Sequence, residues 1–219
     1  MGPGGSIRER GLSPADPGGD AGVLRAKWDQ RYGSAEGLPE PALVLREYAH
    51  LLPGRGEALE LACGLGASAL WLAERGFRVS AWDLSPVAIR QLSAHAQERG
   101  LPVAASVRDV IAEPPPPDCF DLILVAHFLE RGLAPAIAAA LRPGGLLFYQ
   151  TFSREAVSDC GPSDPMYRLA PNELLGLFPD LIVRAYSDEG RIGDTGRGIR
   201  DLALLVAQRP EGSDPEPPP

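Results

Sequence analysis

Two glycines and an aspartate stand at spacings that suit the binding of a nucleoside. The segment Glu60-Leu-Ala-Cys-Gly-Leu-Gly66 ends an apolar run and precedes a helical pattern, so Gly64 and Gly66 lie in a strand-to-helix turn. Asp83 ends the next apolar run, seventeen residues after Gly66. A carboxylate at that position can accept hydrogen bonds from both hydroxyls of a ribose. The spacing therefore predicts a ligand that contains adenosine.

The run from Gly64 to Ala69 also fits the glycine pattern of NAD-binding proteins. Three features argue against NAD. Glu60 stands four residues before the first glycine, and Asp109 follows the third expected strand, where a carboxylate can meet an adenine amino group. The third feature is the final pair of expected strands, which we expect to form an antiparallel hairpin. An NAD-dependent oxidoreductase is kept as an alternative.

A smaller group of residues could act on a second substrate. His127 is the only histidine at the carboxyl end of an expected strand, which makes it the candidate base; packing at a helix start is the other interpretation. Loops near the last three strands carry candidate ligands for an anionic substrate: Arg154, Tyr167, Arg168 and Arg197. The alternative is that these loop side chains are solvated and bind no ligand.

The chain has three cysteines, Cys63, Cys119 and Cys160. Their number is odd and no two of them have Cys-x-x-Cys spacing, so the sequence favours neither a disulfide framework nor a zinc site. We expect no metal centre, and we expect a cytoplasmic protein, because reduced thiols are usual in that compartment.

Strand and helix patterns alternate along the chain. Strands are expected over 58–63, 77–82, 103–107, 120–126, 146–151, 181–186 and 199–207, and helices over 23–32, 41–52, 67–75, 86–99, 134–141 and 171–178. This order predicts an α/β fold, a Rossmann-like doubly wound sheet with helices on both faces. The sheet is mostly parallel, with a C-terminal antiparallel hairpin, because a glycine-rich loop without a helix joins the last two strands.

Length and composition indicate one globular domain. The chain has 219 residues, 44% hydrophobic and 23% charged, and we assign the domain to residues 22–208. Residues 1–21 are expected to be a disordered leader, and residues 209–219, with five prolines, a disordered tail. The net charge of −8 argues against nucleic acid or a membrane surface as partner. No apolar run is long enough to span a bilayer.

Four segments resemble class I S-adenosylmethionine-dependent methyltransferases: Glu60 to Gly66, Trp71 to Phe77, Val79 to Pro86 and Leu141 to Leu146. Three further segments are similar to the tellurite-resistance-type small-molecule methyltransferases: Lys27 to Tyr32, His127 to Arg131 and Phe148 to Phe152. The resemblance covers about residues 25–208. It implies S-adenosylmethionine as cofactor and a small-molecule acceptor.

The resemblance also implies a role for individual residues. The segment from Glu60 to Gly66 would surround the methionine part of the cofactor, Asp83 would hold the ribose, and residues 22–52 would form a helical lid. The residues implied for the cofactor are Trp28, Tyr32, Glu60, Ala62, Cys63, Gly64, Gly66, Asp83, Leu84, Asp109, Val110 and Ala126. His127 would lie near the methyl group, beside Ala126.

The sequence departs from the family pattern at two positions. Ala62 replaces a frequent glycine, which is harmless if its φ is negative. Leu65 stands between the two glycines, where a small or polar residue is common, and makes the loop more apolar.

The reaction expected from the resemblance is an in-line displacement at a methyl group on a sulfonium. The acceptor atom is left open among S, Se, Te, N and O; a soft S, Se or Te nucleophile would need no base. A non-catalytic binding module that keeps only the cofactor pocket is a further alternative. The sequence does not decide between a monomer and a homodimer.

Overall fold

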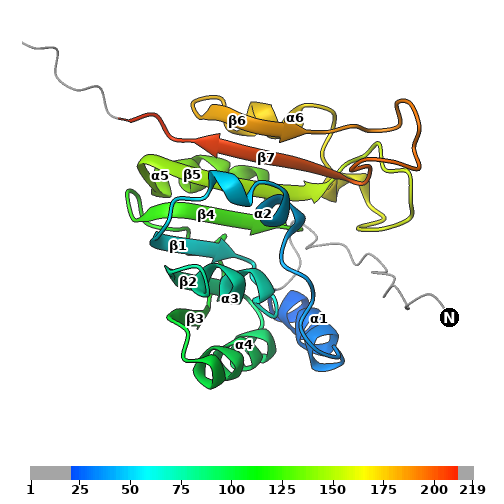
Figure 1. Cartoon of the computed structure of the whole chain (residues 1–219). Helices are drawn as coiled ribbons and strands as arrows, with labels where there is room; N and C mark the ends of the chain where they lie inside the picture. Colours follow the sequence, from blue (N-terminus) through cyan, green and yellow to red (C-terminus); the bar gives the residue numbers. More distant parts are fainter. Residues whose placement is uncertain (1–20, 212–219) are drawn as a thin grey trace, which may run out of the picture.

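The computed structural model describes residues 21–211, and in this range seven strands form one sheet. The strands are β1 (Gly56–Leu61), β2 (Phe77–Asp83), β3 (Val103–Val107), β4 (Phe120–Ala126), β5 (Leu141–Phe152), β6 (Ile182–Ser187) and β7 (Leu202–Gln208). Their order is β3-β2-β1-β4-β5-β7-β6 (Figure 1). The first five strands pair in parallel, and β7 pairs antiparallel with both β5 and β6. The predicted mostly parallel sheet with an antiparallel hairpin is confirmed.

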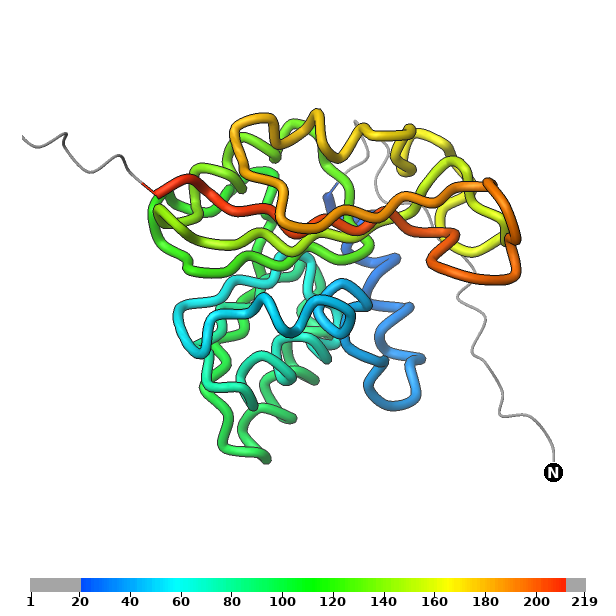
Figure 2. The backbone as a smooth tube through the Cα atoms, turned by 45° about the horizontal axis from the view of Figure 1, so that its top comes forward, coloured from blue at the N-terminus to red at the C-terminus, as the bar shows by residue number. Residues whose placement is uncertain are grey.

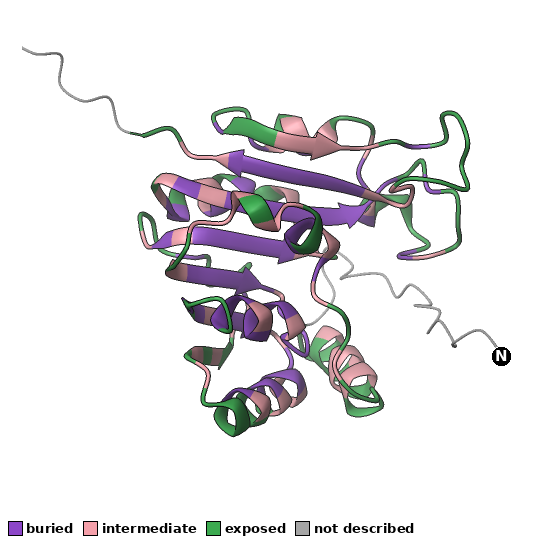
Figure 3. Cartoon of the chain, viewed as in Figure 1, coloured by how far each residue is buried: buried purple, intermediate pink, exposed green. Residues whose placement is uncertain are grey.

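Both faces of the sheet are buried, because neighbouring residues of each central strand point to opposite sides. In β4, Leu122 and Leu124 belong to a cluster that includes side chains of the helices α2 (Leu43–Glu47), α3 (Ala67–Ala73) and α4 (Pro86–Arg99). Ile123 and Val125 belong to the opposite cluster, with α5 (Ala134–Ala140) and α6 (Glu173–Leu177). Figure 3 shows the resulting burial of the central strands.

The strand order reverses beside β1, which has β2 on one side and β4 on the other. Crossover connections leave the sheet in opposite directions at such a point, so a crevice opens at the carboxyl ends of the strands. The first helix, α1 (Ala21–Gly33), lies at this end of the sheet (Figure 1). The segment that follows β5 and the β6–β7 connection also extend past it (Figure 2).

Local sequence explains where α4 begins and ends. The Ser85 hydroxyl accepts a hydrogen bond from the Ala88 amide at 3.2 Å, and Pro86 occupies the first turn. Gly100 ends the helix in the left-handed conformation, with φ +64°. The boundaries match those predicted from the sequence.

Most other boundaries differ from the prediction by no more than a few residues, and two elements differ more strongly. The helix expected over 41–52 is divided at Tyr48 into α2 and a 3-10 turn, Ala49–Leu51. β5 begins at Leu141, because Leu141 pairs with Phe120 and a register shift before Leu122 accommodates the Pro-Gly-Gly segment.

The predicted leader and tail fall largely outside the described residues, which exclude 1–20 and 212–219. Ala21 begins α1. The Arg209 guanidinium donates to the Asp118 carboxylate at 2.6 Å, and the Arg209 backbone pairs with Gly144 and Gly145, which extends the pairing of β7 with β5 by one residue. No helix within residues 21–211 is long and apolar enough to cross a membrane.

Candidate functional site

A cleft of about 800 Å³ opens at the carboxyl ends of β1, β2 and β4. Every residue that the resemblance assigned to the cofactor lines this cleft, except Gly66. These lining residues are Trp28, Tyr32, Glu60, Ala62, Cys63, Gly64, Asp83, Leu84, Asp109, Val110 and Ala126. His127 lines the same cleft. The fold therefore brings together residues from four strand ends and from α1.

The two glycines have different structural roles. Gly64 has φ +52°, and a Cβ built on it would lie 2.9 Å from the Tyr32 Oη, so a larger residue would collide with α1. Gly66 precedes α3 with φ +73°, and a Cβ there would overlap the Leu92 side chain. Gly64 thus keeps the cleft open, whereas Gly66 allows α3 and α4 to pack closely.

The condition under which Ala62 would be harmless, a negative φ, is not met, because its φ is +51°. An alanine in the left-handed region costs roughly 1–2 kcal/mol, since its Cβ approaches the next carbonyl. His127 at the end of β4 also has a positive φ, +56°. Of the four non-glycine residues with positive φ within 21–211, these two line the cleft. Backbone strain therefore occurs at the ends of both strands that flank the crevice.

Glu60 carries a buried carboxyl group that lacks a full set of partners. The residue is 4% exposed, and its Oε2 has no hydrogen-bond partner among residues 21–211. Burial raises the pKa of Glu60 to about 8, against the effect of hydrogen bonds from Ala69 and Ser68. A buried acceptor of this kind, open to the cleft, suits a cationic group such as the ammonium of a methionine moiety. The site fits the implied cofactor at this position.

Asp83 connects the glycine turn to the end of β2. Its Oδ2 accepts from the Gly64 amide and its Oδ1 from the Ser85 amide, each at 2.8 Å. Burial raises the pKa of Asp83, and these two hydrogen bonds oppose the shift. Each carboxylate oxygen has further acceptor capacity, so Asp83 can also receive hydroxyl donors from the cleft.

Cys63 lines the same cleft as Glu60 and Asp83. Burial, followed by the negative charges of Asp83 and Glu60, raises the pKa of its thiol. The thiol is therefore protonated at neutral pH and is a poor nucleophile.

The expected adenine side of the cleft combines Leu84, the buried Val110 and Asp109. The Asp109 Oδ1 accepts from the amides of Ile111 and Ala112 at 3.0 and 3.3 Å, which fixes the turn after β3. Arg108 lies over the Trp82 ring, 3.9 Å from its centre. The carboxylate of Asp109 thus has a structural role in this turn.

The helix α1 covers one side of the cleft and is attached to α4. Asp29 accepts hydrogen bonds from the Ser85 hydroxyl and, at 3.4 Å, from the Val87 amide. Gln91 donates to the Tyr32 carbonyl at 3.1 Å, and the Tyr32 ring stacks on Trp28 with 5.5 Å between centres. Burial, followed by the charge of Asp83, raises the pKa of Tyr32. Sequence reasoning missed Asp29, because its partner Ser85 is 56 residues away.

His127 is held by two residues that sequence reasoning did not select. The Gln150 Nε2 lies 2.9 Å from the His127 Nε2, and the Gln150 Oε1 accepts from the Val44 amide at 2.8 Å. The His127 amide also donates to the Gln150 carbonyl at 2.9 Å. The His127 ring stacks on Phe152 with 5.1 Å between centres. Two sequence signals pointed toward Gln150: it is a polar residue inside a buried strand, and it lies in the segment from Phe148 to Phe152 that carries part of the family resemblance.

The four candidate ligands for an anionic substrate divide into one residue at the cleft and three outside it. Tyr167 lines the cleft, whereas Arg154, Arg168 and Arg197 do not. The Arg154 Nε donates to the Pro165 carbonyl at 3.1 Å, and Arg168 donates to the carbonyls of Pro162 and Ser153 at 2.6 and 3.0 Å. These guanidinium groups order the loop after β5 instead of facing a ligand.

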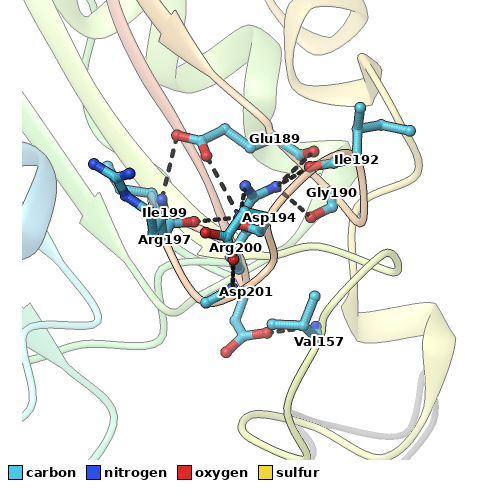
Figure 4. Close-up of polar contacts among 10 residues, drawn as sticks. Val157, Glu189, Gly190, Ile192, Asp194, Arg197, Ile199, Arg200 and Asp201 are labelled. Atoms are coloured by element: carbon cyan, nitrogen blue, oxygen red, sulfur yellow. Dashed lines mark hydrogen bonds and ion pairs between the residues drawn. The ribbon is translucent and has the colours of Figure 1, made fainter.

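Arg197 belongs to the β6–β7 connection, which Arg200 organises (Figure 4). The Arg200 side chain donates to the carbonyls of Ile192, Asp194 and Gly190 at 2.7, 2.8 and 3.3 Å. The neighbouring Asp201 accepts from the Val157 amide at 2.7 Å. The loop that contains Arg197 is thereby tied to the segment after β5.

Comparison with known proteins identifies relatives. A family model described as a methyltransferase domain matches residues 58–145. The ubiquinone biosynthesis O-methyltransferase of Methylocella silvestris is 32% identical over 193 residues, which cover 79% of this chain and 73% of that protein. The chain spans about half the length of other curated relatives of this name that it matches.

Two solved structures have the same fold. One comes from work on the conversion of a disulfide bond into a thioacetal group during echinomycin biosynthesis. It has a TM-score of 0.66, 25% identity, and coverage of 87% of this chain and 94% of its own. The other is TehB from Haemophilus influenzae, with a TM-score of 0.61, 19% identity, and coverage of 84% and 66%.

Proposed function

The chain belongs to the class I S-adenosylmethionine-dependent methyltransferases, and we propose that it methylates a small organic acceptor bound beside His127. The observation that carries the proposal is the buried, incompletely bonded carboxyl group of Glu60 in the same cleft as Asp83 and Gly64. A cationic cofactor that contains adenosine satisfies both features. The positive charge of NAD⁺ lies on a nicotinamide nitrogen that carries no N–H, so it cannot donate a hydrogen bond to Glu60, and NAD is not favoured.

The cofactor-binding roles follow from the chemistry of each side chain. Glu60 would accept the ammonium group of the methionine moiety, and Asp83 would accept the ribose hydroxyls. Leu84 and Val110 offer apolar surface to the adenine ring, beside Asp109. When bound, S-adenosylmethionine supplies a methyl group on a sulfonium, which is both the electrophile and the leaving group.

The chain contributes orientation and exclusion of water. Trp28 and Tyr32 of α1 close one side of the cleft, and α1 is attached to α4 through Asp29. Holding two reactants in line contributes roughly 7–11 kcal/mol to a displacement of this type. No metal is needed for this step, since the sulfonium already activates the methyl group.

The lining around His127 supports an acceptor with an apolar, flat body. Phe152 stacks on the His127 ring, and the other uncharged side chains that line the cleft include Leu24, Phe128, Leu129, Pro162 and Tyr167. Aromatic walls bind planar molecules well. The curated relative is a ubiquinone biosynthesis O-methyltransferase, so we propose oxygen as the acceptor atom.

Sulfur is the second candidate for the acceptor atom. The observation that favours it is the similarity to the structure from work on the conversion of a disulfide bond into a thioacetal group, since both of these groups contain sulfur. We do not propose an inorganic oxyanion of the tellurite type, because Arg154, Arg168 and Arg197 lie outside the cleft. The similarity to TehB, at 19% identity, concerns the fold and does not bear on the acceptor.

Formation of S-adenosylhomocysteine tests the proposal. The full chain is incubated with S-adenosylmethionine and, in parallel, with phenols, aromatic thiols and selenite or tellurite. We expect turnover with a phenol or a thiol, and lower turnover at subsaturating S-adenosylmethionine with the Asp83→Ala variant, which lacks the ribose ligand. Calorimetric binding of NAD without binding of S-adenosylhomocysteine would overturn the assignment. Cofactor binding without turnover on any acceptor would favour a non-catalytic binding module.

A further inference from the structure

We infer that Arg131 is a positioning residue for the methyl acceptor: from outside the cleft, it holds together the two walls of the cleft beside His127. Its effect reaches the acceptor through Tyr167. The contacts that join the walls lie within the chain, whereas the role toward the acceptor rests on the proposed function.

The two walls come from different parts of the chain. The β4 wall follows His127 directly, and the β5 wall belongs to the segment after β5. The β4 wall consists of Phe128, Leu129 and Glu130, and the β5 wall consists of Gly161, Pro162 and Tyr167. Gly161 packs so closely on the Phe152 ring that a Cβ would overlap it, and this ring stacks on His127. The β5 wall is therefore joined to His127 through Phe152.

The Arg131 guanidinium reaches from the end of the β4 wall to the backbone of the β5 wall. Its Nη1 donates to the Met166 carbonyl at 2.6 Å, and its Nη2 donates to the Arg168 carbonyl at 3.2 Å. These carbonyls belong to the two neighbours of Tyr167, which lines the cleft and is 8% exposed. Arg131 itself does not line the cleft. It therefore fixes the backbone on both sides of Tyr167 from outside the cleft.

Glu173 fixes the direction of the guanidinium group. The Arg131 Nε donates to the Glu173 Oε1 at 2.5 Å, and Nη2 donates to Oε2 at 3.2 Å, so the two side chains form a paired contact. Oε2 also accepts the Ala170 amide at 2.7 Å, which attaches the carboxylate to the start of α6. The hydrogen bond from Arg131 lowers the pKa of Glu173, so the carboxylate is charged at neutral pH. A planar guanidinium can form all four contacts, whereas a lysine ammonium, which is a single point charge, cannot.

Other contacts hold each wall by itself. The Phe128 carbonyl accepts the Tyr149 hydroxyl at 2.8 Å, which attaches the β4 wall to the sheet. Arg154 and Arg168 donate to carbonyls of their own segment after β5, at 3.1 and 2.6 Å. Arg131, in contrast, comes from the other wall. Loss of its contacts should therefore leave each wall folded and change how the two walls stand to each other.

The spacing of the walls affects the acceptor and not the cofactor. A flat acceptor that lies between the walls contacts Phe128 on one side and Tyr167 on the other, so its binding and alignment depend on their separation. Glu60 and Asp83 lie near the ends of other strands, β1 and β2. An error of about 1 Å in the placement of a reactant can slow a reaction by about a hundredfold. Arg131 should therefore influence kcat/KM for the acceptor without changing the affinity for the cofactor.

Arg131→Lys tests the inference, because it keeps the charge but loses the paired contact and the hold on both carbonyls. With the phenol or aromatic thiol that is turned over, kcat/KM for the acceptor should fall by roughly ten- to a hundredfold. The Kd for S-adenosylhomocysteine in calorimetry should be unchanged. Glu173→Gln should act in the same direction with a smaller effect. An unchanged kcat/KM for the acceptor in Arg131→Lys, or a matching loss of affinity for S-adenosylhomocysteine, would overturn the inference.

Arg142→Lys is the matched control. Arg142 forms another partly exposed ion pair, with 2.9 Å between its Nη1 and the Asp121 Oδ2, near the amino ends of β4 and β5. This end of the sheet is opposite to the cleft, so the acceptor kinetics should remain those of the wild type. Urea unfolding measures the stability of both variants. An equal fall of kcat/KM in Arg142→Lys would mean that lower stability explains the effect of Arg131→Lys, and the inference would fail.

Tyr167→Leu tests the path from Arg131 to the acceptor. If Arg131 acts through Tyr167, the two substitutions share one effect. Arg131→Lys should then lower kcat/KM for the acceptor much less in the Tyr167→Leu background than in the wild type. Losses that multiply in the double variant would show that Arg131 acts by another route, which would contradict the inference.

Hydrogen exchange of the free chain tests the link between the walls without any acceptor. Arg131→Lys should raise the exchange rate of amides in residues 161–169 and leave residues 58–66 unchanged. If the exchange responds in this way but no acceptor is turned over, the proposed function fails, and Arg131 remains only a link between the walls. If an acceptor is turned over and the exchange in residues 161–169 does not change, only this inference fails.

Discussion

Glu60→Gln should have opposite effects on stability and on cofactor binding. Glutamine keeps the shape and the hydrogen-bond acceptor of the side chain but cannot become charged. In the free protein the buried charge of Glu60 is unfavourable, as its pKa of about 8 indicates. In the complex the same charge faces the cationic end of the cofactor. The substitution should therefore stabilise the free protein at alkaline pH and weaken the complex.

The size of the stability effect follows from the pKa shift. The pKa rises from an ordinary 4.5 to about 8, and each unit corresponds to about 1.4 kcal/mol. Between these values the folded state binds more protons than the unfolded state, so stability falls as pH rises. Glu60 should lower the free energy of unfolding by roughly 4 kcal/mol between about pH 5 and pH 9. Glu60→Gln removes this contribution.

The assay is urea unfolding of the wild type, Glu60→Gln and Glu47→Gln across this pH range. Glu47 is an exposed carboxylate at the end of α2 and serves as the control. The difference between wild type and Glu60→Gln should grow with pH, while Glu47→Gln follows the wild type. Calorimetry at neutral pH should show at least a tenfold loss of affinity for S-adenosylhomocysteine in Glu60→Gln. Parallel pH profiles for wild type and Glu60→Gln would refute the reasoning.

Three further substitutions give expected outcomes at other positions. Ala62→Gly should raise the free energy of unfolding by about 1 kcal/mol, because it relieves the positive φ; urea unfolding that shows a loss would contradict this. Asp83→Ala should weaken S-adenosylhomocysteine binding by roughly 1–3 kcal/mol in calorimetry, with exposed Asp180→Ala as control, and an unchanged Kd would refute the ribose contact. Arg200→Ala should speed proteolysis within residues 188–200, since it removes donors to five loop carbonyls; an unchanged cleavage rate would argue against Arg200 as the organiser of this loop.

The fold could be predicted because its signals are local. The boundaries of α4 follow from Ser85, Pro86 and Gly100, and the burial of both faces of β4 follows from its nearly continuous apolar run. The glycine turn and Asp83 lie at the ends of neighbouring parallel strands, so their proximity follows from the order of elements alone.

The part of the cleft proposed to bind the methyl acceptor could not be predicted in the same way. Val44 and Gln150 are 106 residues apart and meet only after α2 packs on the sheet. Arg154 and Arg168 occupy loops that suggest ligand binding, but these loops lack regular structure and use the guanidinium groups to satisfy their own carbonyls. The sequence left the sign of φ at Ala62 open, and its left-handed conformation could not be predicted because alanine usually avoids that region.

A crystal structure of the chain grown with S-adenosylhomocysteine tests the central claim most directly. We predict the ligand in the cleft at the ends of β1, β2 and β4, with its ammonium group on the Glu60 carboxylate and its ribose hydroxyls on Asp83. A ligand bound elsewhere, or one that leaves Glu60 and Asp83 without contacts to it, would contradict the assignment of this cleft.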